Sequence, residues 1–311
     1  MALEAATNEG RLFAIGQAHK RLRRLALQIT RATRSSTADA VHDVRVAIRR
    51  FTQSISVCQT YFRGSDKWKN RRRLKKIMTA AGEVRNCDVG LKFIVKFREP
   101  HSVQLRPKLQ SLRKESEGVL LTELRKWTDR KMSVKWHADL DSAPSPSKGN
   151  LGAETADELA RRLLGRTAKD FLKRGNQASS PQASPKGLHH FRIAAKKFRY
   201  ALELFEPLYG SSLDPIVASI KDTSTLLGEI NDSVTVAAMV ADYKGGGRLA
   251  ARLKKRQHKK TNEFRKYWDQ TFGDGYQLRS AIDRLTLVEP QVERKPAASS
   301  QSASGRRKSA A

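Results

Sequence analysis

Two segments of the chain, one in each half, carry a histidine followed by cations at helical spacing. At matching positions they contain His42, Arg45 and Arg49, then His189, Arg192 and Lys196. Residues three and seven positions apart lie on the same side of an α-helix, so each set forms one stripe. A guanidinium group binds a phosphate in bidentate fashion, and an ammonium group binds it as a point charge. The spacing therefore predicts that the stripes bind a linear polyanion.

The apolar residues of the same two helices predict where the stripes lie. They form one face on each helix, made of Val44, Ile48, Phe51 and Ile55 and of Phe191, Phe198, Leu202 and Phe205. Each stripe runs beside this face, and Arg199 extends the second stripe. Arg50 and Lys197 point to another side of their helices. A neighbouring helix can then wall each stripe into a groove, although long cationic side chains that only cover the core edge are the simpler alternative.

A second pair of motifs follows in the same order. Lys75 precedes Gly82-Glu83 by seven residues, and Lys221 precedes Gly228-Glu229 by seven. Two motifs that recur in order at a nearly constant offset indicate an internal duplication. Chance similarity between two basic helices is the alternative. A glycine inside a helix costs about 1 kcal/mol relative to alanine. Close approach of another helix would explain both glycines, and an ordinary kink is the alternative.

The charge of the whole chain favours a polyanionic partner. There are 61 Lys and Arg residues against 31 Asp and Glu, which gives a formal net charge of +30, while 39% of the 311 residues are hydrophobic. The apolar fraction is sufficient for a core, and the charge repels itself unless an anion compensates it. Nucleic acid, polyphosphate and an anionic membrane surface are the candidate partners.

The periodicity predicts an all-α fold made of two four-helix bundles. We expect helices at 8–34, 36–63, 67–98 and 101–131, then at 154–175, 187–209, 213–243 and 248–273. The predicted domain spans 8–273, with a first bundle at about 8–137, a Pro/Ser/Gly-rich linker at 138–153 and a second bundle at 154–273. Residues 176–186 read as a flexible loop, and 289–311 as a disordered basic tail.

Several other functions are disfavoured by what the sequence contains. Cys58 and Cys87 are the only cysteines and no His-Glu-x-x-His motif occurs, so we expect no metal and no cofactor. No phosphate-binding glycine loop is found and the acidic residues near the motifs stand singly, which favours binding over catalysis. No apolar run is long enough to cross a membrane and no signal peptide is expected, so the predicted location is the cytoplasm.

The motif residues resemble the conserved histidine α-helical domain, or CHAD, family. The resemblance lies in Val41-His42-Asp43-Val44-Arg45-Val46-Ala47-x-Arg49-Arg50, in Leu188-His189-x-x-Arg192-Ile193-x-x-Lys196-Lys197-Phe198-Arg199-Tyr200, and in the segments around Gly82 and Gly228. It covers about 8–275. It implies two four-helix bundles related by a pseudo-two-fold axis, and a basic surface that binds inorganic polyphosphate, often at polyphosphate granules. The oligomeric state is not determined by the sequence.

The resemblance also implies which residues bind the anion. They are His42, Arg45, Arg49, Arg50, Lys75, Arg85, His189, Arg192, Lys196, Lys197, Arg199 and Lys221. Family members commonly carry Arg-Asp after the first glycine, whereas this chain has Arg85-Asn86, which leaves Asp88 as the candidate partner for Arg85. Nucleic acid stays the alternative ligand. The key aromatic residues fall on the predicted core faces, where they cannot stack on bases.

Overall fold

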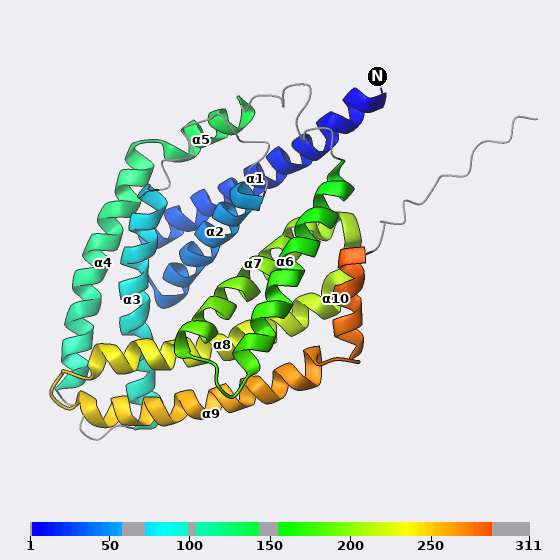
Figure 1. Cartoon of the computed structure of the whole chain (residues 1–311). Coiled ribbons are helices and arrows are strands. Elements are labelled where there is room, and N and C mark those ends of the chain that lie inside the picture. The colour runs from blue at the N-terminus through cyan, green and yellow to red at the C-terminus, as the bar shows by residue number, and fades with distance from the viewer. Residues whose placement is uncertain (1, 58–71, 99–103, 143–154, 288–311) are drawn as a thin grey trace, which may run out of the picture.

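The computed structural model describes residues 2–57, 72–98, 104–142 and 155–287, which are helical without a strand. The predicted all-α class is confirmed. The helices are α1 (Ala2–Arg34), α2 (Ala38–Val57), α3 (Arg72–Phe97), α4 (Leu105–Asp129), α5 (Met132–Asp141), α6 (Ala156–Ser179), α7 (Pro185–Tyr209), α8 (Asp214–Val240), α9 (Gly246–Phe272) and α10 (Gln277–Leu287), with a 3₁₀ turn, η3, at Gly210–Leu213 (Figure 1).

Local sequence signals set the ends of the two basic helices, α2 and α7. Thr37 lies directly before α2, and its side chain accepts a hydrogen bond from the N–H of Ala40 in the first turn of the helix. Ser184 caps α7 by accepting from the Gly187 N–H at 3.1 Å, and Pro185 occupies the first helical position. A capping side chain satisfies one of the N–H groups that a helix start leaves unpaired. Each stripe therefore begins about one turn inside a well-defined helix start.

Consecutive helices pack against each other as α1 with α2, α3 with α4, α6 with α7, and α8 with α9. The two halves of the chain meet where α1 contacts α6, α2 contacts α7 and α3 contacts α8. In Figure 1, the lower ends of α3 and α4 lie beside the turn that joins α8 to α9, at the lower left of the view. The contact between α2 and α7 places the helices that carry the two stripes next to each other. The internal duplication itself stays a prediction from the motifs.

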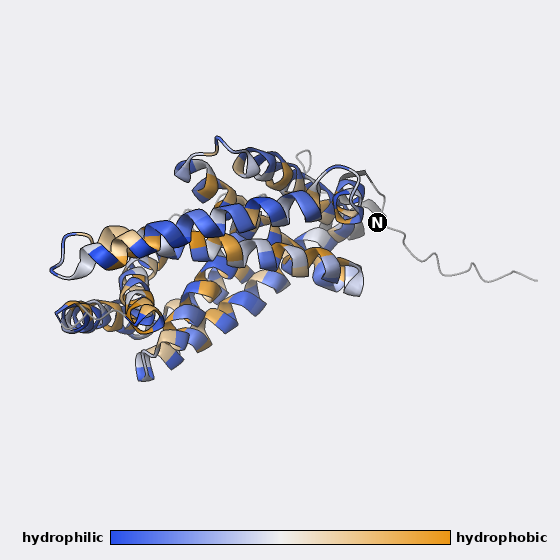
Figure 2. Cartoon of the chain, turned by 90° about the horizontal axis from the view of Figure 1, so that it is seen from below, coloured by the Kyte–Doolittle hydropathy of each residue, from blue (hydrophilic) through white to orange (hydrophobic). Residues whose placement is uncertain are grey.

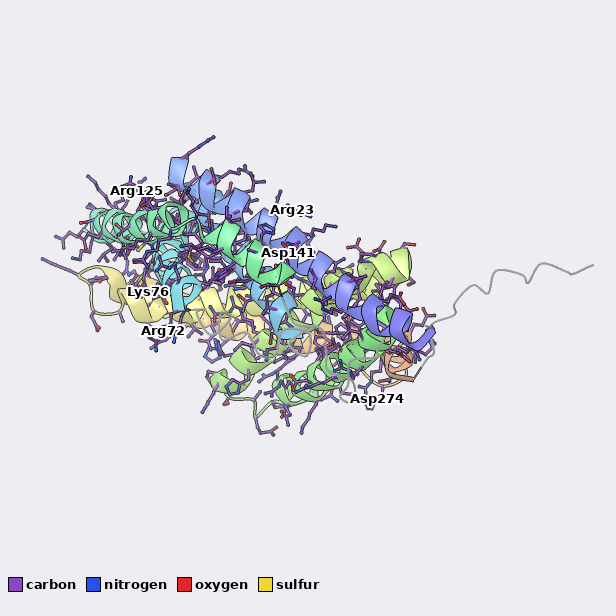
Figure 3. All side chains as sticks on the ribbon, turned by 90° about the horizontal axis from the view of Figure 1, so that it is seen from above. Arg23, Arg72, Lys76, Arg125, Asp141 and Asp274 are labelled. Atoms are coloured by element: carbon purple, nitrogen blue, oxygen red, sulfur yellow. The ribbon has the colours of Figure 1, made fainter. Side chains whose placement is uncertain are left out.

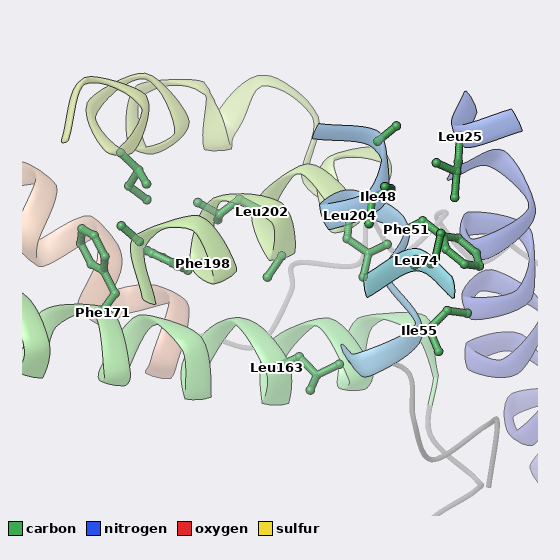
Figure 4. Packing of buried hydrophobic residues seen from close by; sticks show 14 of the residues in the cluster. Leu25, Ile48, Phe51, Ile55, Leu74, Leu163, Phe171, Phe198, Leu202 and Leu204 are labelled. Atoms are coloured by element: carbon green, nitrogen blue, oxygen red, sulfur yellow. The ribbon is translucent and has the colours of Figure 1, made fainter. Parts of the chain in front are cut away.

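The main hydrophobic core runs through both halves without interruption. Figure 4 shows its buried side chains from α1, α2 and α3 close to those from α6 and α7. The predicted core faces are confirmed, since the eight residues assigned to them on α2 and α7 are at most 3% exposed. A second, smaller core joins α3 and α4 to α8 and α9, and includes Phe93, Leu109, Val240 and Leu253. Both cores therefore hold the two halves together.

Two helices lie where the sequence predicted none. Within the predicted linker, α5 continues to Asp141, because Trp136 and Leu140 are buried against the first half. Beyond the predicted end of the domain, α10 packs on α6, and its Ile282 is fully buried. The predicted loop 176–186 is too long, since α6 extends to Ser179 and α7 starts at Pro185. The rest of the linker and the predicted tail, 289–311, lie outside the described residues.

Hydrophilic and hydrophobic residues form separate bands along individual helices (Figure 2). Such banding is expected for helices that bury one side in a core and expose the other to water. Of the helices that the structure describes, none is both long enough and apolar enough to cross a bilayer.

Candidate anion-binding site

The packing of α2 on α7 and of α3 on α8 brings cations from both halves together. We call this group the central cation cluster; it consists of Arg45, Arg49, Arg85, Arg192 and Lys196. Burial lowers the pKa of Lys196 to about 6, and the positive charges of Arg192, Arg49, Arg199 and Arg45 add to this effect. A lysine with this pKa is largely neutral at pH 7, because burial and the neighbouring cations disfavour its charged form.

Arg45 is held in the cluster by α3. Its Nη1 donates a hydrogen bond to the Met78 carbonyl at 2.9 Å. Burial lowers the pKa of Arg45 to about 10, with further lowering by Arg49 and Arg85. A Cβ atom at position 82 would lie 3.0 Å from Arg45 Nη1, so Gly82 makes room for this guanidinium. The expected close approach therefore occurs at Gly82, but the approaching group is a side chain and not a helix backbone.

The second glycine does not share this role. A Cβ atom at Gly228 would meet no atom within 4 Å. The close-approach explanation is therefore wrong for Gly228, because α8 leaves open space at this position.

Arg85 is oriented by a carboxylate from the other half of the chain. Its Nη2 lies 3.2 Å from Asp232 Oδ2, and both side chains are 28% exposed. The candidate partner suggested by the sequence, Asp88, instead accepts from Arg113 Nε at 2.9 Å. That expectation was wrong because Arg113 of α4 is already against Asp88, whereas the contact between α3 and α8 brings Asp232 to Arg85.

Arg192 of α7 is partly buried. Burial lowers its pKa, as does the charge of Arg49. Its Nε is buried and has no hydrogen-bond partner in the described part of the chain. Beside it is a cavity of about 80 Å³ that His189 also lines. An unsatisfied buried donor next to a cavity is a feature that an anion could satisfy.

The carboxylate of Glu203 compensates two other predicted ligands. Arg50 Nε lies 2.8 Å from Glu203 Oε2, and Arg199 Nε lies 3.4 Å from Oε1. The Arg199 guanidinium also lies over the Tyr200 ring, 5.0 Å from its centre. In contrast, no carboxylate of the described residues lies within ion-pair distance of four members of the cluster, which are Arg45, Arg49, Arg192 and Lys196. The positive charge of the cluster is thus mostly uncompensated.

The two motif histidines lie at the outer ends of the stripes. His42 is exposed, yet partial burial and the charge of Arg85 lower its pKa, which favours the neutral imidazole. His189 is exposed on α7. A neutral imidazole can still donate one hydrogen bond to a phosphate oxygen.

Three further predicted ligands are exposed at the periphery, and their role stays a prediction. Lys197 lies on the outer side of α7, and Lys221 on α8. Lys75 lines a groove of about 510 Å³ together with residues of α3 and α4, such as Thr79 and Val119.

Sequence reasoning missed two carboxylates that orient predicted ligands. Asp232 pairs with Arg85, and Glu203 pairs with Arg50 and Arg199.

The family to which this chain belongs follows from a direct comparison. The model of the CHAD domain matches residues 16–241. The chain belongs to the CHAD domain family. The match includes both basic helices, and in the first half it covers α2 to α5 completely and α1 from residue 16. No curated protein is similar enough in sequence to count as a match.

Solved structures share the CHAD fold with this chain. The crystal structure of the CHAD domain from the plant Ricinus communis aligns with a TM-score of 0.66 and 18% identity, over 90% of this chain and 93% of that one. PptA from Streptomyces chartreusis aligns with a TM-score of 0.64 and 17% identity, over 84% of this chain and 99% of that one. At these identities the similarity shows the fold alone.

Proposed function

We propose that this CHAD domain binds inorganic polyphosphate in the central cation cluster and catalyses no reaction on it. The observation that carries the proposal is the burial of Lys196 among Arg45, Arg49 and Arg192, with a pKa of about 6. Burying like charges without compensation destabilises a fold, and a polyanion relieves that cost. A chain of linked phosphates offers oxygen atoms at regular intervals to cations that lie along two adjacent helices.

Two features support polyphosphate over nucleic acid. The phenylalanines of the basic helices, Phe51, Phe191, Phe198 and Phe205, are at most 1% exposed and cannot stack on bases. The cations of the cluster are partly or largely buried, so the ligand that reaches them has to be slender. A polyphosphate chain has no bases or sugars and meets this requirement.

Two further features support binding without catalysis. Asp232, which contacts the cluster, and Glu203, which contacts Arg50, are each ion-paired with arginine. In the described residues, no group of three His, Cys, Asp or Glu side chains is placed to hold a metal ion. We further propose that the protein associates with cytoplasmic polyphosphate granules, which fluorescence microscopy of the tagged chain would test.

The binding proposal is tested by calorimetric titration at physiological salt. The ligands are long-chain polyphosphate and single- and double-stranded nucleic acids with matched numbers of phosphates. The central variant combines Arg45→Ala, Arg49→Ala, Arg192→Ala and Lys196→Ala. A control variant removes four exposed charges that lie outside the motifs, through Lys20→Ala, Lys114→Ala, Lys169→Ala and Lys266→Ala.

We expect polyphosphate to bind more tightly than either nucleic acid, and the central variant to lose at least tenfold in affinity while the control changes little. Equal binding of all polyanions would favour the nucleic-acid alternative. Equal losses in the two variants would show that only the total charge matters, and would overturn the assignment of the site.

A further inference from the structure

A second group of cations lies where α3 meets the corner between α4 and α5. It surrounds a pocket of about 460 Å³, which we call the corner pocket. Three helical segments contribute the six cations that line it, which are Arg72, Arg73, Lys76, Lys126, Arg130 and Lys135. In Figure 3, Arg72 and Lys76 are labelled where α3 comes close to α4 and α5. Arg72, Arg73 and Lys76 lie together at the start of α3, and none of them belongs to the central cation cluster.

The corner pocket carries more positive charge than its own carboxylate can compensate. Glu123 is the acidic residue among its lining residues, and its Oε1 lies 2.9 Å from Lys126 Nζ. Arg73 Nη1 donates to the Lys126 carbonyl at 3.1 Å, near the C-terminal end of α4. The other four cations, Arg72, Lys76, Arg130 and Lys135, have no carboxylate of the described residues within ion-pair distance.

The backbone of the corner adds to the attraction for an anion. Lys131 adopts a left-handed conformation, with φ of 50°, and this turns the chain from α4 into α5. No side chain caps the start of α5, and Met132, its first residue, lines the pocket. The first N–H groups of a helix have no partner within the helix and form the positive end of its dipole. The start of α5 therefore lies beside the pocket that the six cations line.

We infer that the corner pocket is a second anion-binding site, separate from the central cation cluster, and that it binds short linear oligophosphates. Its volume is in the range of small-ligand sites, which is about 300–1,000 Å³. The residues that line it include no aromatic ring on which a nucleobase could stack. Several unpaired cations of flexible reach match an anion with many oxygen atoms better than a single phosphate. The ligand is either a free oligophosphate or one segment of a longer chain.

The test is a calorimetric titration of the full chain with inorganic tripolyphosphate. The corner variant combines Arg72→Ala, Lys76→Ala, Arg130→Ala and Lys135→Ala. It is compared with the central variant and with the control variant that lacks four exposed lysines. Because all four changed side chains are exposed, we expect the corner variant to keep its circular dichroism spectrum. Lys76→Glu with Lys135→Glu provides a second variant that reverses charge at only two positions.

We expect the corner variant to lose at least tenfold in affinity for tripolyphosphate at one site, while the central and control variants keep that site. Titration with long-chain polyphosphate after saturation distinguishes the two sources. Competition identifies the ligand as a chain segment, and additive binding identifies it as a free oligophosphate. A corner variant that titrates like the control would overturn the inference. Because the central variant is measured in parallel, failure of this site and failure of the central site are distinguishable.

Discussion

At the scale of single residues, the balance of charge in the central cation cluster depends most on Lys196. Burial together with the charges of four arginines lowers its pKa to about 6, whereas an ordinary lysine has a pKa of 10.5. Guanidinium groups keep their charge at neutral pH even when buried, so the lysine is the member that gives up its proton. The cluster therefore has one position whose charge depends on whether an anion is present.

This position predicts a pH dependence of polyphosphate affinity. A bound anion favours the charged ammonium and raises the pKa of Lys196 above its value in the free protein, about 6. Between the two pKa values the complex holds more protons than the free protein, so affinity falls as pH rises above about 6, by at most about tenfold per pH unit. Calorimetry from pH 6 to 8.5, in buffers with different ionisation enthalpies, measures both the affinity and the proton uptake.

The substitution Lys196→Arg is the matched control, because arginine stays charged throughout this range. The variant should show a weaker pH dependence of affinity than the wild-type protein, and no proton uptake at this residue. If the wild-type protein and the variant showed the same pH profile, Lys196 would not be in contact with the anion. A contribution of His42, whose pKa is also lowered, would remain in both proteins and is thereby separated.

At the scale of single elements, α3 positions the cluster through a backbone feature. Met78 supplies the carbonyl that accepts from Arg45, and Gly82, one turn later, leaves space for the same guanidinium. The corresponding helix of the second half, α8, has open space at Gly228. The two glycines occupy matching motif positions, yet only at Gly82 does a neighbouring side chain occupy the space that a Cβ atom would need.

The pair of glycines provides a prediction with an internal control. Gly228→Ala should stabilise the protein by up to about 1 kcal/mol, since alanine is the better helix former, and should leave polyphosphate affinity unchanged. Gly82→Ala should displace the Arg45 guanidinium and weaken its hydrogen bond, which lowers affinity by roughly two- to tenfold. Urea denaturation and calorimetry measure the two effects. An unchanged affinity in Gly82→Ala would show that Arg45 tolerates the displacement.

At the scale of the whole molecule, the two halves of the chain contact each other more extensively than two separate domains would. The rings of Phe13 and Phe205 stack at 5.6 Å, and Arg252 donates to the Phe97 carbonyl at 3.0 Å. The pair formed by Arg85 and Asp232 also crosses between halves. Because the main core is continuous, separating the two halves would expose buried apolar surface of both to water.

We therefore expect the chain to unfold in one cooperative transition. In differential scanning calorimetry, the ratio of calorimetric to van't Hoff enthalpy should be close to one, and polyphosphate should shift the whole transition to higher temperature. Two resolved transitions, or a fragment of residues 155–311 that unfolds like the full chain, would indicate independent bundles.

The sequence by itself determined the features that depend on helical periodicity. The all-α class, the core faces with Phe51 and Phe198, and the placement of cations beside these faces follow from the spacing of apolar and basic residues. Local periodicity carries this information because side chains three, four and seven residues apart share one side of a helix.

Only the tertiary structure decided which residues meet across the chain. It paired Arg85 with Asp232 and not with Asp88, gave Gly82 and Gly228 different surroundings, and packed α5 and α10 on the core. It also placed Arg73 at the corner pocket and Lys75 at the neighbouring groove, while Arg72 and Lys76 line both. These outcomes depend on contacts between residues that are far apart in sequence, and a helical period contains no information about which helix its exposed side will meet.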